Sequence, residues 1–355
     1  MTMQTRFPRA LALRLASALA VAAVVSAAGA GCAGGGAAAP NDGPSSGSAD
    51  PSQPVGEILS DKTTAKVLAA EDDATFARTL LAVDRRVDAF IALGVEPGDA
   101  ARKDRELTQS GLEAVVAQHL DRFLAVAASK DDPTRRRVAV KALAFANDVR
   151  AAAAVVPAIE QTSDTHLQTV AGFALARLRD ANTPLPPLLA AARSPDVDVR
   201  VNALLALWHV LEARGKVGNF VDRASRDAAL PVLESVLFDP DDPMVRGHAA
   251  AALGALGDPR GVDSLLNLLR DKQPFVRSHT AIALGKLGDR RAIQPLVDVI
   301  DETPRGDTKG YVLLAVTLLL EREGISVPAG LADDQRSWSL FVQRAFADKA
   351  RRPLK

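Results

Sequence analysis

The fold is decided by two stretches that align with each other without a gap, DDPMVRGHAAAALGALGDPRGVDSLLNLL at residues 241–269 and DKQPFVRSHTAIALGKLGDRRAIQPLVDVI at residues 271–300. Each contains Val-Arg, then Ala-Leu-Gly-x-Leu-Gly-Asp, then a second apolar run. Self-similarity at a short fixed period is typical of repeat proteins, in which one unit cannot bury its apolar surface alone and neighbouring units stack.

Fainter copies of the repeat lie on either side of these two. With the arginine of Val-Arg as reference, the equivalent positions are Arg136, Gln168, Arg200, Arg246, Arg277 and Lys309. All but the last are followed six and seven residues later by Ala-Leu. The successive intervals are 32, 32, 46, 31 and 32 residues. The regular period predicts a repeat array over residues 131–324 that contains one insertion.

Each copy predicts two helices joined by a sharp turn. Asp242 is placed to cap the first helix, because a side-chain oxygen at this position accepts from free backbone N–H groups. We interpret the glycines of Ala-Leu-Gly-x-Leu-Gly as helix ends, with Gly257 and Gly288 taking a left-handed conformation. Asp258 and Asp289 then cap the second helices.

The motif resembles the short HEAT-like repeats of the phycobilisome-lyase type. This resemblance implies an all-α fold, a right-handed α-solenoid of stacked helix pairs. Aromatic residues make up only 4% of the chain, which favours closely packed helices over strands. We expect an N-terminal helical cap at residues 55–130 and a C-terminal capping helix with a basic tail at residues 325–355.

The two flanking regions have helical apolar stripes of their own. The N-terminal stripes are formed by Phe76, Leu80, Val83, Val87 and Phe90, ended by Gly94, and by Leu112, Val115, Val116, Leu120, Phe123 and Val126. Near the C-terminus, Trp338, Phe341, Val342 and Ala345 form an apolar face opposite polar residues. A terminal helix with a polar outer face is what the exposed end of a solenoid requires.

The N-terminus reads as an export signal. Three arginines precede Leu15, and residues 15–28 are apolar but shorter than the roughly 20 residues that span a bilayer. The one cysteine of the chain follows in Gly29-Ala30-Gly31-Cys32, which resembles the lipobox of bacterial lipoproteins. Gly29 departs from that pattern, where leucine is usual.

The lipobox resemblance implies a signal peptide at residues 1–31 and a lipid on Cys32. Residues 32–54 are rich in Gly, Ala, Ser and Pro and predict a flexible tether. By the same analogy, Ala33 favours the outer membrane, facing the periplasm. Cleavage after Ala30 to release a periplasmic protein, an uncleaved anchor, or a merely buried thiol are the alternatives.

The charge balance argues against a nucleic-acid partner. The chain has 43 basic and 43 acidic side chains, and loss of residues 1–31 would leave 40 basic against 43 acidic. Nucleic-acid binding requires a strongly basic face. No cofactor is indicated, because the sequence has no Gly-rich phosphate loop and no G-x-S-x-G motif.

The five histidines indicate structural roles rather than a metal centre. His248 and His279 occupy equivalent repeat positions on neighbouring helices, about 10 Å apart, which is too far for one ion unless the side chains converge. The deoxyhypusine hydroxylases, which are HEAT-repeat enzymes, hold iron with His-Glu dipeptides, and no histidine here precedes glutamate. His209 and Glu212 share one helix face but form only a weak metal pair.

The repeated arginines Arg200, Arg246 and Arg277 have acidic neighbours such as Asp198 and Asp271. We interpret them as a ladder of structural salt bridges, with an anion-binding stripe as the alternative.

The insertion in the 46-residue interval is a candidate partner site at residues 214–227. Insertions in solenoids fall on one face and often carry binding. Phe220 would be an apolar anchor there, flanked by Arg214, Lys216 and Arg223. The alternative is a tolerated surface loop.

The sequence therefore predicts a non-catalytic protein-binding scaffold, tethered to the bacterial cell envelope by a lipid. Its protein partner is not identified by these residues. The alternative is an enzyme or a chromophore-handling factor related to the bilin lyases that share such repeats.

Overall fold

The computed structural model describes residues 73–92, 99–160, 163–218, 221–302 and 307–351. Cys32, the tether, Gly94 and Phe220 lie outside these ranges. The described residues form fifteen α-helices and no strand, which confirms the all-α prediction. Among them, no helix is both long enough and apolar enough to pass through a membrane.

The chain divides into two compact units, residues 1–123 and 124–355. The helices of the first unit are α4 (Asp73–Ala92), α5 (Asp99–Gln118) and the start of α6 (Leu120–Ala128), which crosses the boundary. Its core contains all of the first predicted stripe and, from the second, Leu112, Val115, Val116 and Phe123, whereas Leu120 is partly buried and Val126 lies in the second unit. Phe76 packs edge-on against Phe123 with ring centroids 5.4 Å apart.

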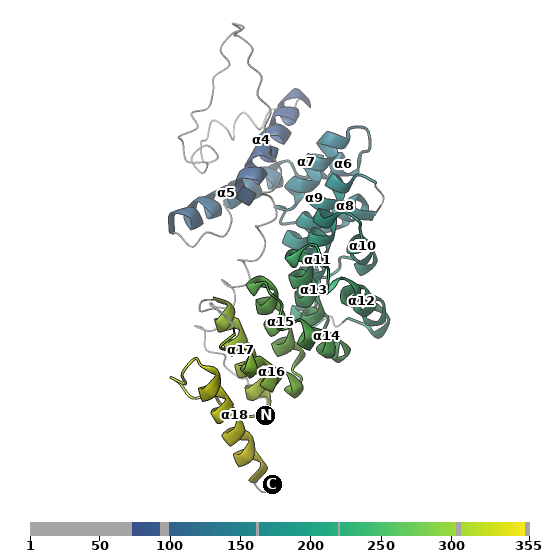
Figure 1. The fold of residues 1–355 in the computed structure, drawn as a ribbon. Coiled ribbons are helices and arrows are strands. Elements are labelled where there is room, and N and C mark those ends of the chain that lie inside the picture. Colours follow the sequence, from purple (N-terminus) through teal and green to yellow (C-terminus); the bar gives the residue numbers. More distant parts are fainter. Residues whose placement is uncertain (1–72, 93–98, 161–162, 219–220, 303–306, 352–355) are drawn as a thin grey trace, which may run out of the picture. The chain divides into compact units, whose positions relative to one another are not determined.

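The second unit consists of six helix pairs in sequence order (Figure 1). The first helices of the pairs are α7 (Pro133–Leu143), α9 (Thr165–Leu178), α11 (Val197–Lys216), α13 (Pro243–Leu256), α15 (Pro274–Leu287) and α17 (Asp307–Arg322). The second helices are α8 (Arg150–Glu160), α10 (Leu185–Ala191), α12 (Arg223–Val236), α14 (Val262–Leu268), α16 (Ile293–Asp298) and α18 (Gln335–Arg351). Short 3₁₀ turns, η1 (Pro259–Gly261) and η2 (Arg290–Ala292), precede α14 and α16.

Local sequence fixes where these helices begin and end. The Asp242 carboxylate accepts from the backbone N–H of Met244 at 2.6 Å, at the start of α13. Gly257 ends α13 with φ of 69°, a left-handed conformation that glycine adopts without strain. Asp258 accepts from the N–H of Arg260 and starts η1.

The prediction that both glycines of Ala-Leu-Gly-x-Leu-Gly end the helix is wrong for the first glycine of each copy. Gly254 and Gly285 lie inside α13 and α15, where the next first helix approaches them closely. A Cβ atom at Gly254 would lie 2.6 Å from Cα of Ala283, and one at Gly285 would lie 3.1 Å from Cα of Ala315. These glycines therefore permit close stacking of α13, α15 and α17.

The first helices form the continuous row of the second unit. Each packs on the first helix of the next pair, from α7 to α17, and these contacts are more extensive than those between second helices. In Figure 1, α11, α13 and α15 follow one another, with α10 and α12 along one side of the row. The core lies between the two rows and is made of Leu, Val and Ala side chains.

The extra residues of the third pair lengthen its helices. We expected them in a loop at residues 214–227, but α11 has 20 residues where α9, α13 and α15 have 14. Likewise α12 has 14 residues where α10 and α14 have 7. Ala, Leu and Arg support helix propagation here, and Asp222 caps α12 through the N–H of Ser225.

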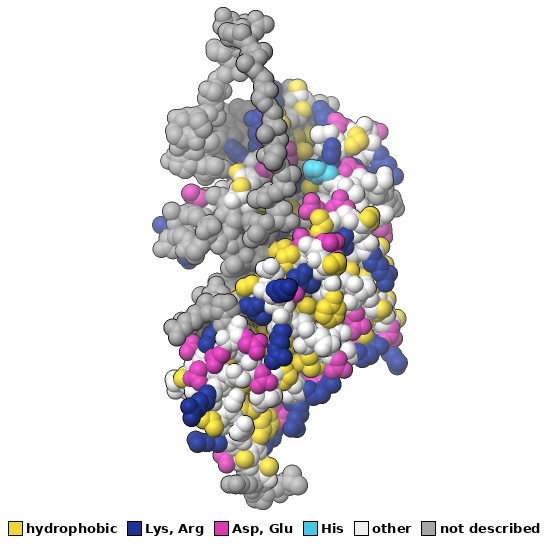
Figure 2. Space-filling model, viewed as in Figure 1, with side chains coloured by type: hydrophobic (Ala, Val, Ile, Leu, Met, Phe, Trp, Pro, Cys, Tyr) yellow, Lys and Arg dark blue, Asp and Glu magenta, His cyan; other side chains and the backbone are white. Residues whose placement is uncertain are grey.

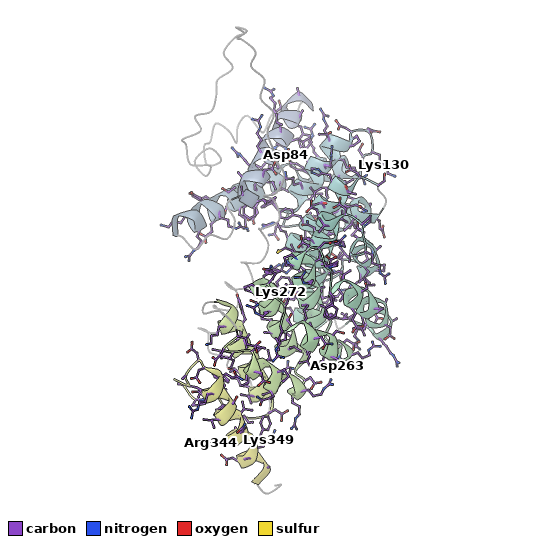
Figure 3. The ribbon with its side chains drawn as sticks, viewed as in Figure 1. Asp84, Lys130, Asp263, Lys272, Arg344 and Lys349 are labelled. Atoms are coloured by element: carbon purple, nitrogen blue, oxygen red, sulfur yellow. The ribbon has the colours of Figure 1, made fainter. Side chains whose placement is uncertain are left out.

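Helix α18 packs on α16, the second helix of the preceding pair. Trp338 and Val342 of α18 are buried. Its outer side is polar, with the exposed Arg344 among its residues (Figure 3). Lys349 Nζ lies 2.6 Å from Glu323 Oε2.

Candidate functional site

A group of polar and aromatic side chains that contact one another lies on three consecutive first helices. We call it the Trp208 cluster. It comprises Trp208, His209 and Glu212 of α11, His248 of α13, and Phe275, His279 and Lys286 of α15.

The rings of the cluster stack on and across one another. His209 stacks on Trp208 with centroids 4.6 Å apart, and His279 meets the same indole edge-on at 5.3 Å. His279 also contacts Phe275 at 4.2 Å, and His248 lies 6.2 Å from Trp208. Aromatic pairs in such geometries contribute about 0.5–1.5 kcal/mol beyond the area they bury.

Side chains of α11 and α15 meet across α13, the helix between them. Lys286 of α15 forms an ion pair with Glu212 of α11. Near the start of α13, a side chain at Gly247 would collide with the Phe275 ring of α15. The third pair is thus joined directly to the fifth.

The electrostatics of the cluster keep one carboxylate charged and two imidazoles neutral. Burial alone would raise the pKa of Glu212, but His209, Lys286 and Trp208 outweigh it and hold this pKa well below its usual range. Burial lowers the pKa of His279 to about 4, against the opposing hydrogen bond to Phe275. Burial also lowers the pKa of His209, although Glu212 opposes the change.

The histidines converge more than their helix spacing predicted. The rings of His248 and His279 are 6.3 Å apart, because both side chains point toward Trp208. Nδ1 of His209 lies 3.9 Å from Glu212 Oε2, which is too long for a hydrogen bond. Within the described ranges, no group of three or more His, Cys, Asp or Glu side chains could hold a metal ion.

The repeated arginines bind the stack internally. Arg200 pairs with Asp239 at 3.1 Å rather than with the expected Asp198. The Asp239 backbone carbonyl accepts from Arg246 at 2.9 Å, and Arg246 also makes a bidentate pair with Asp271 at 2.7 and 3.2 Å. The Asp271 carbonyl then accepts from Arg277 at 2.7 Å.

These bonds form a chain through the third, fourth and fifth pairs. Each aspartate carboxylate binds the arginine of one pair, and its backbone carbonyl binds the arginine of the next. The arginine nitrogens named above are therefore directed into the protein, which favours the structural ladder over the anion-binding stripe.

The predicted partner residues have different environments. Arg214 donates to the carbonyl oxygens of Ala181 and Thr183, at 2.9 and 2.8 Å, and so bonds the preceding pair. Lys216 is exposed at the end of α11, and Arg223 is 92% exposed with Nε 3.6 Å from Asp227. Phe220, the predicted apolar anchor, lies outside the described residues.

The sequence reasoning missed Trp208, Lys286 and Asp239. The sequence spacing could have indicated Asp239, because Asp239 precedes Arg246 by seven residues and Asp271 precedes Arg277 by six. Trp208 directly precedes His209, so the sequence alone shows one of the two tryptophans of the chain beside a histidine. Nothing in the repeat pattern pairs Lys286 with Glu212, which is 74 residues away.

The chain is similar to several known proteins. It is 35% identical over 135 residues to deoxyhypusine hydroxylase of Neurospora crassa, a match that covers 34% of this chain and 41% of that enzyme. The chain thus matches less than half the length of this relative. A crystal structure of an engineered protein is similar with a TM-score of 0.48 and 16% identity, covering 83% of this chain and 93% of that one. The crystal structure of Kap121p bound to Pho4p is similar with a TM-score of 0.45 and 16% identity, covering 82% of this chain and 33% of that one.

The family model for HEAT repeats matches residues 230–316, from α12 to α17. These residues include both aligned stretches of the sequence and the members of the Trp208 cluster that belong to α13 and α15. The chain therefore contains HEAT repeats.

Proposed function

We propose that the chain is a non-catalytic protein-binding scaffold held at the bacterial cell envelope by a lipid on Cys32. The observation that carries the proposal is the HEAT-repeat stack itself, because stacked helix pairs present an extended surface on which a protein partner can lie. The predicted signal peptide, the lipobox-like sequence at Cys32 and the predicted tether, all within residues 1–54, support the envelope location.

The surface charge supports a protein partner over a nucleic acid. Figure 2 shows basic and acidic side chains interspersed over the visible face of the second unit, without a field of one sign. Several arginines of the repeats are held in internal bonds, including Arg246 and Arg214. A phosphate backbone would need such cations to be free and clustered.

A second candidate is an enzyme, and the match to deoxyhypusine hydroxylase is the observation that favours it. The match covers only 34% of the chain and 41% of that enzyme. No histidine is followed by glutamate in the sequence, and fold similarity does not carry activity. The scaffold is therefore the better supported of the two.

The test is affinity capture of the tagged full-length protein from detergent-solubilised membranes, with mass spectrometry of its N-terminal peptide. We expect a diacylated N-terminal cysteine at position 32 and a stoichiometric protein partner. The matched control is Cys32→Ala, which keeps the repeats and removes the acceptor sulfur.

The outcomes separate the parts of the proposal. Loss of the membrane fraction in Cys32→Ala, with capture of the same partner, supports both the anchor and the scaffold. An unmodified Cys32 in the wild type overturns the anchor. A captured metal ion or small molecule with no protein partner overturns the scaffold in favour of the enzyme.

A further inference from the structure

The Trp208 cluster joins repeats that are not neighbours. The Glu212–Lys286 pair connects α11 with α15, and the aromatic contacts of Trp208 reach both α13 and α15. His248 Nδ1 lies 3.3 Å from the Val201 carbonyl oxygen and ties α13 to α11. The angle between the third and fifth pairs is therefore fixed by side chains of the cluster, in addition to the contacts of α13.

The hydrogen bond of His279 identifies which of its nitrogens can take up a proton. Its Nδ1 lies 2.9 Å from the Phe275 carbonyl oxygen. Because a carbonyl only accepts, Nδ1 carries the hydrogen in the neutral ring and Nε2 is the basic nitrogen. A second proton would therefore place a positive charge on a ring packed between Trp208 and Phe275.

We propose that the Trp208 cluster is a proton-sensitive clamp, which holds the third, fourth and fifth repeats at a fixed angle when its histidines are neutral and releases them when the histidines are protonated. Release separates α11 from α15 while each helix stays formed. In the clamp, His209 and His279 are the rings whose protonation we follow, and the His248 ring faces His279 at 6.3 Å. Glu212 and Lys286 are the fixed charges.

The charged groups around the clamp act in opposite directions. Glu212 of α11 favours protonation of both His209 and His279. Lys286 of α15 opposes protonation of both, and Arg179, which follows α9, opposes it at His209. His209 and His279 also oppose each other, since each would carry the same charge. Burial is the largest influence on both rings, so the stacked state prefers neutral imidazoles.

The sign of the pH effect follows directly. The pKa of His279 is about 4 in the stacked state against 6.5 for an unperturbed imidazole. The clamp is thus fully stable above pH 6.5 and weakens as the pH falls toward 4. Proton uptake at this one ring shifts the equilibrium toward release by on the order of 100-fold by pH 4.

The clamp does not depend on the proposed scaffold function. Its physiological use rests on that function, because a partner that spans the third to fifth repeats would sense their angle. A purified chain tests the clamp without a partner, so failure of one proposal is distinguishable from failure of the other.

The experiment follows Trp208 in the full-length Trp338→Phe variant, in which Trp208 is the remaining tryptophan. We expect its fluorescence emission to shift to longer wavelength between pH 6.5 and 4, while the helical circular dichroism signal stays constant. His279→Gln in the same background keeps a donor to the Phe275 carbonyl but takes up no proton. It should move the transition to lower pH and make it less steep.

The matched control is His166→Gln, which removes an exposed histidine of α9. It should leave the emission curve unchanged. Any of three results would overturn the clamp. The emission could stay constant down to pH 4, the curve could be identical with and without His279, or the emission change could coincide with loss of helix.

Hydrogen exchange of the unmodified chain supplies a test without core substitutions. At pH 5 relative to pH 7.5, corrected for intrinsic rates, α11, α13 and α15 should lose protection on their facing sides while α8 keeps it. Equal protection at both pH values would overturn the proposal.

Discussion

Arg246 bonds in two directions along the stack. Its Nη1 donates to the Asp239 carbonyl oxygen of the loop before α13, and its Nε and Nη2 bind the Asp271 carboxylate of the loop before α15. The pair is nearly buried, with side-chain exposures of 15% and 9%. Removal of the arginine therefore leaves a carboxylate without its partner in a poorly solvated place.

We predict that Arg246→Ala lowers the free energy of unfolding by about 3 kcal/mol, the range found when one partner of a buried pair is removed. Urea denaturation at pH 7 measures it. The control is Arg270→Ala, because Arg270 pairs with Glu302 at 67% and 55% exposure. That substitution should cost less than about 1 kcal/mol. Equal losses in the two variants would contradict the internal role of Arg246.

At two glycines, Gly254 and Gly215, we expect the addition of one methyl group to change the stability in opposite directions. Gly254→Ala should destabilise the protein by about 1–3 kcal/mol, because the new Cβ would lie 2.6 Å from Cα of Ala283. Gly215→Ala should stabilise it by up to about 1 kcal/mol, since nothing lies within 4 Å of that site and alanine is the better helix former. Thermal unfolding compares them, and a stabilising Gly254→Ala would contradict the close stacking of α13 on α15.

For single residues, the sequence predicts those features that depend only on residues close by in the chain. Asp242 and Gly257 have their environments within a few positions, so capping rules suffice for both. The close packing at Gly254 was not predictable from local rules, because the atom that excludes a side chain belongs to another repeat. The same limit explains why Arg200 was given Asp198 as a neighbour and binds Asp239.

The starts of the second helices depend on a charged cap. Asp258 accepts from the N–H of Arg260, and its carboxylate also binds the Arg260 side chain. The Arg260 hydrogen bonds lower the pKa of Asp258. Because the folded pKa is the lower one, this stabilisation is present above about pH 4 and is lost as the pH falls further.

We predict that Asp258→Ala costs about 1 kcal/mol at pH 7, the usual contribution of a cap. Asp258→Asn should retain most of the cap and lose the pH dependence, because asparagine caps helices and does not titrate. The difference in stability between wild type and Asp258→Asn should therefore shrink from pH 7 to pH 3. A constant difference in urea unfolding at the two pH values would contradict the charged role.

The helices of the third pair show what a period can and cannot predict. The 46-residue interval indicated extra residues in the right place. It did not indicate their conformation, because a period measures chain length alone. The structure has them as additional turns of α11 and α12, which places Glu212 on α11 within reach of Lys286.

The second unit needs α18 to close its stack. Trp338 and Val342 are 4% and 5% exposed, and without them apolar surface of α16 would face water. We predict that a chain ending at Gly324 self-associates, whereas one ending at Arg351 behaves as the full chain does. Size-exclusion chromatography with light scattering measures this. Monomers of equal stability for both would show that α18 is dispensable.

For the second unit, the repeated motif with its capping residues was sufficient to predict stacked helix pairs, because the stacking follows from one unit repeated, and the resemblance to HEAT-like repeats supplied the all-α solenoid. The Trp208 cluster was not predictable, because its members belong to three repeats and break the period. His248 and His279 are equivalent positions, but Trp208 and Lys286 are not.

The bridge from Glu212 to Lys286 bears on how such an array can evolve. Repeat proteins lengthen and shorten by duplication or loss of one unit, which is harmless when each unit touches only its neighbours. Here the glutamate of one unit has its lysine two units further on. Insertion or removal of a single unit between them would separate the pair. We expect the third, fourth and fifth repeats to be inherited as a block, while the ends of the array are free to vary in number.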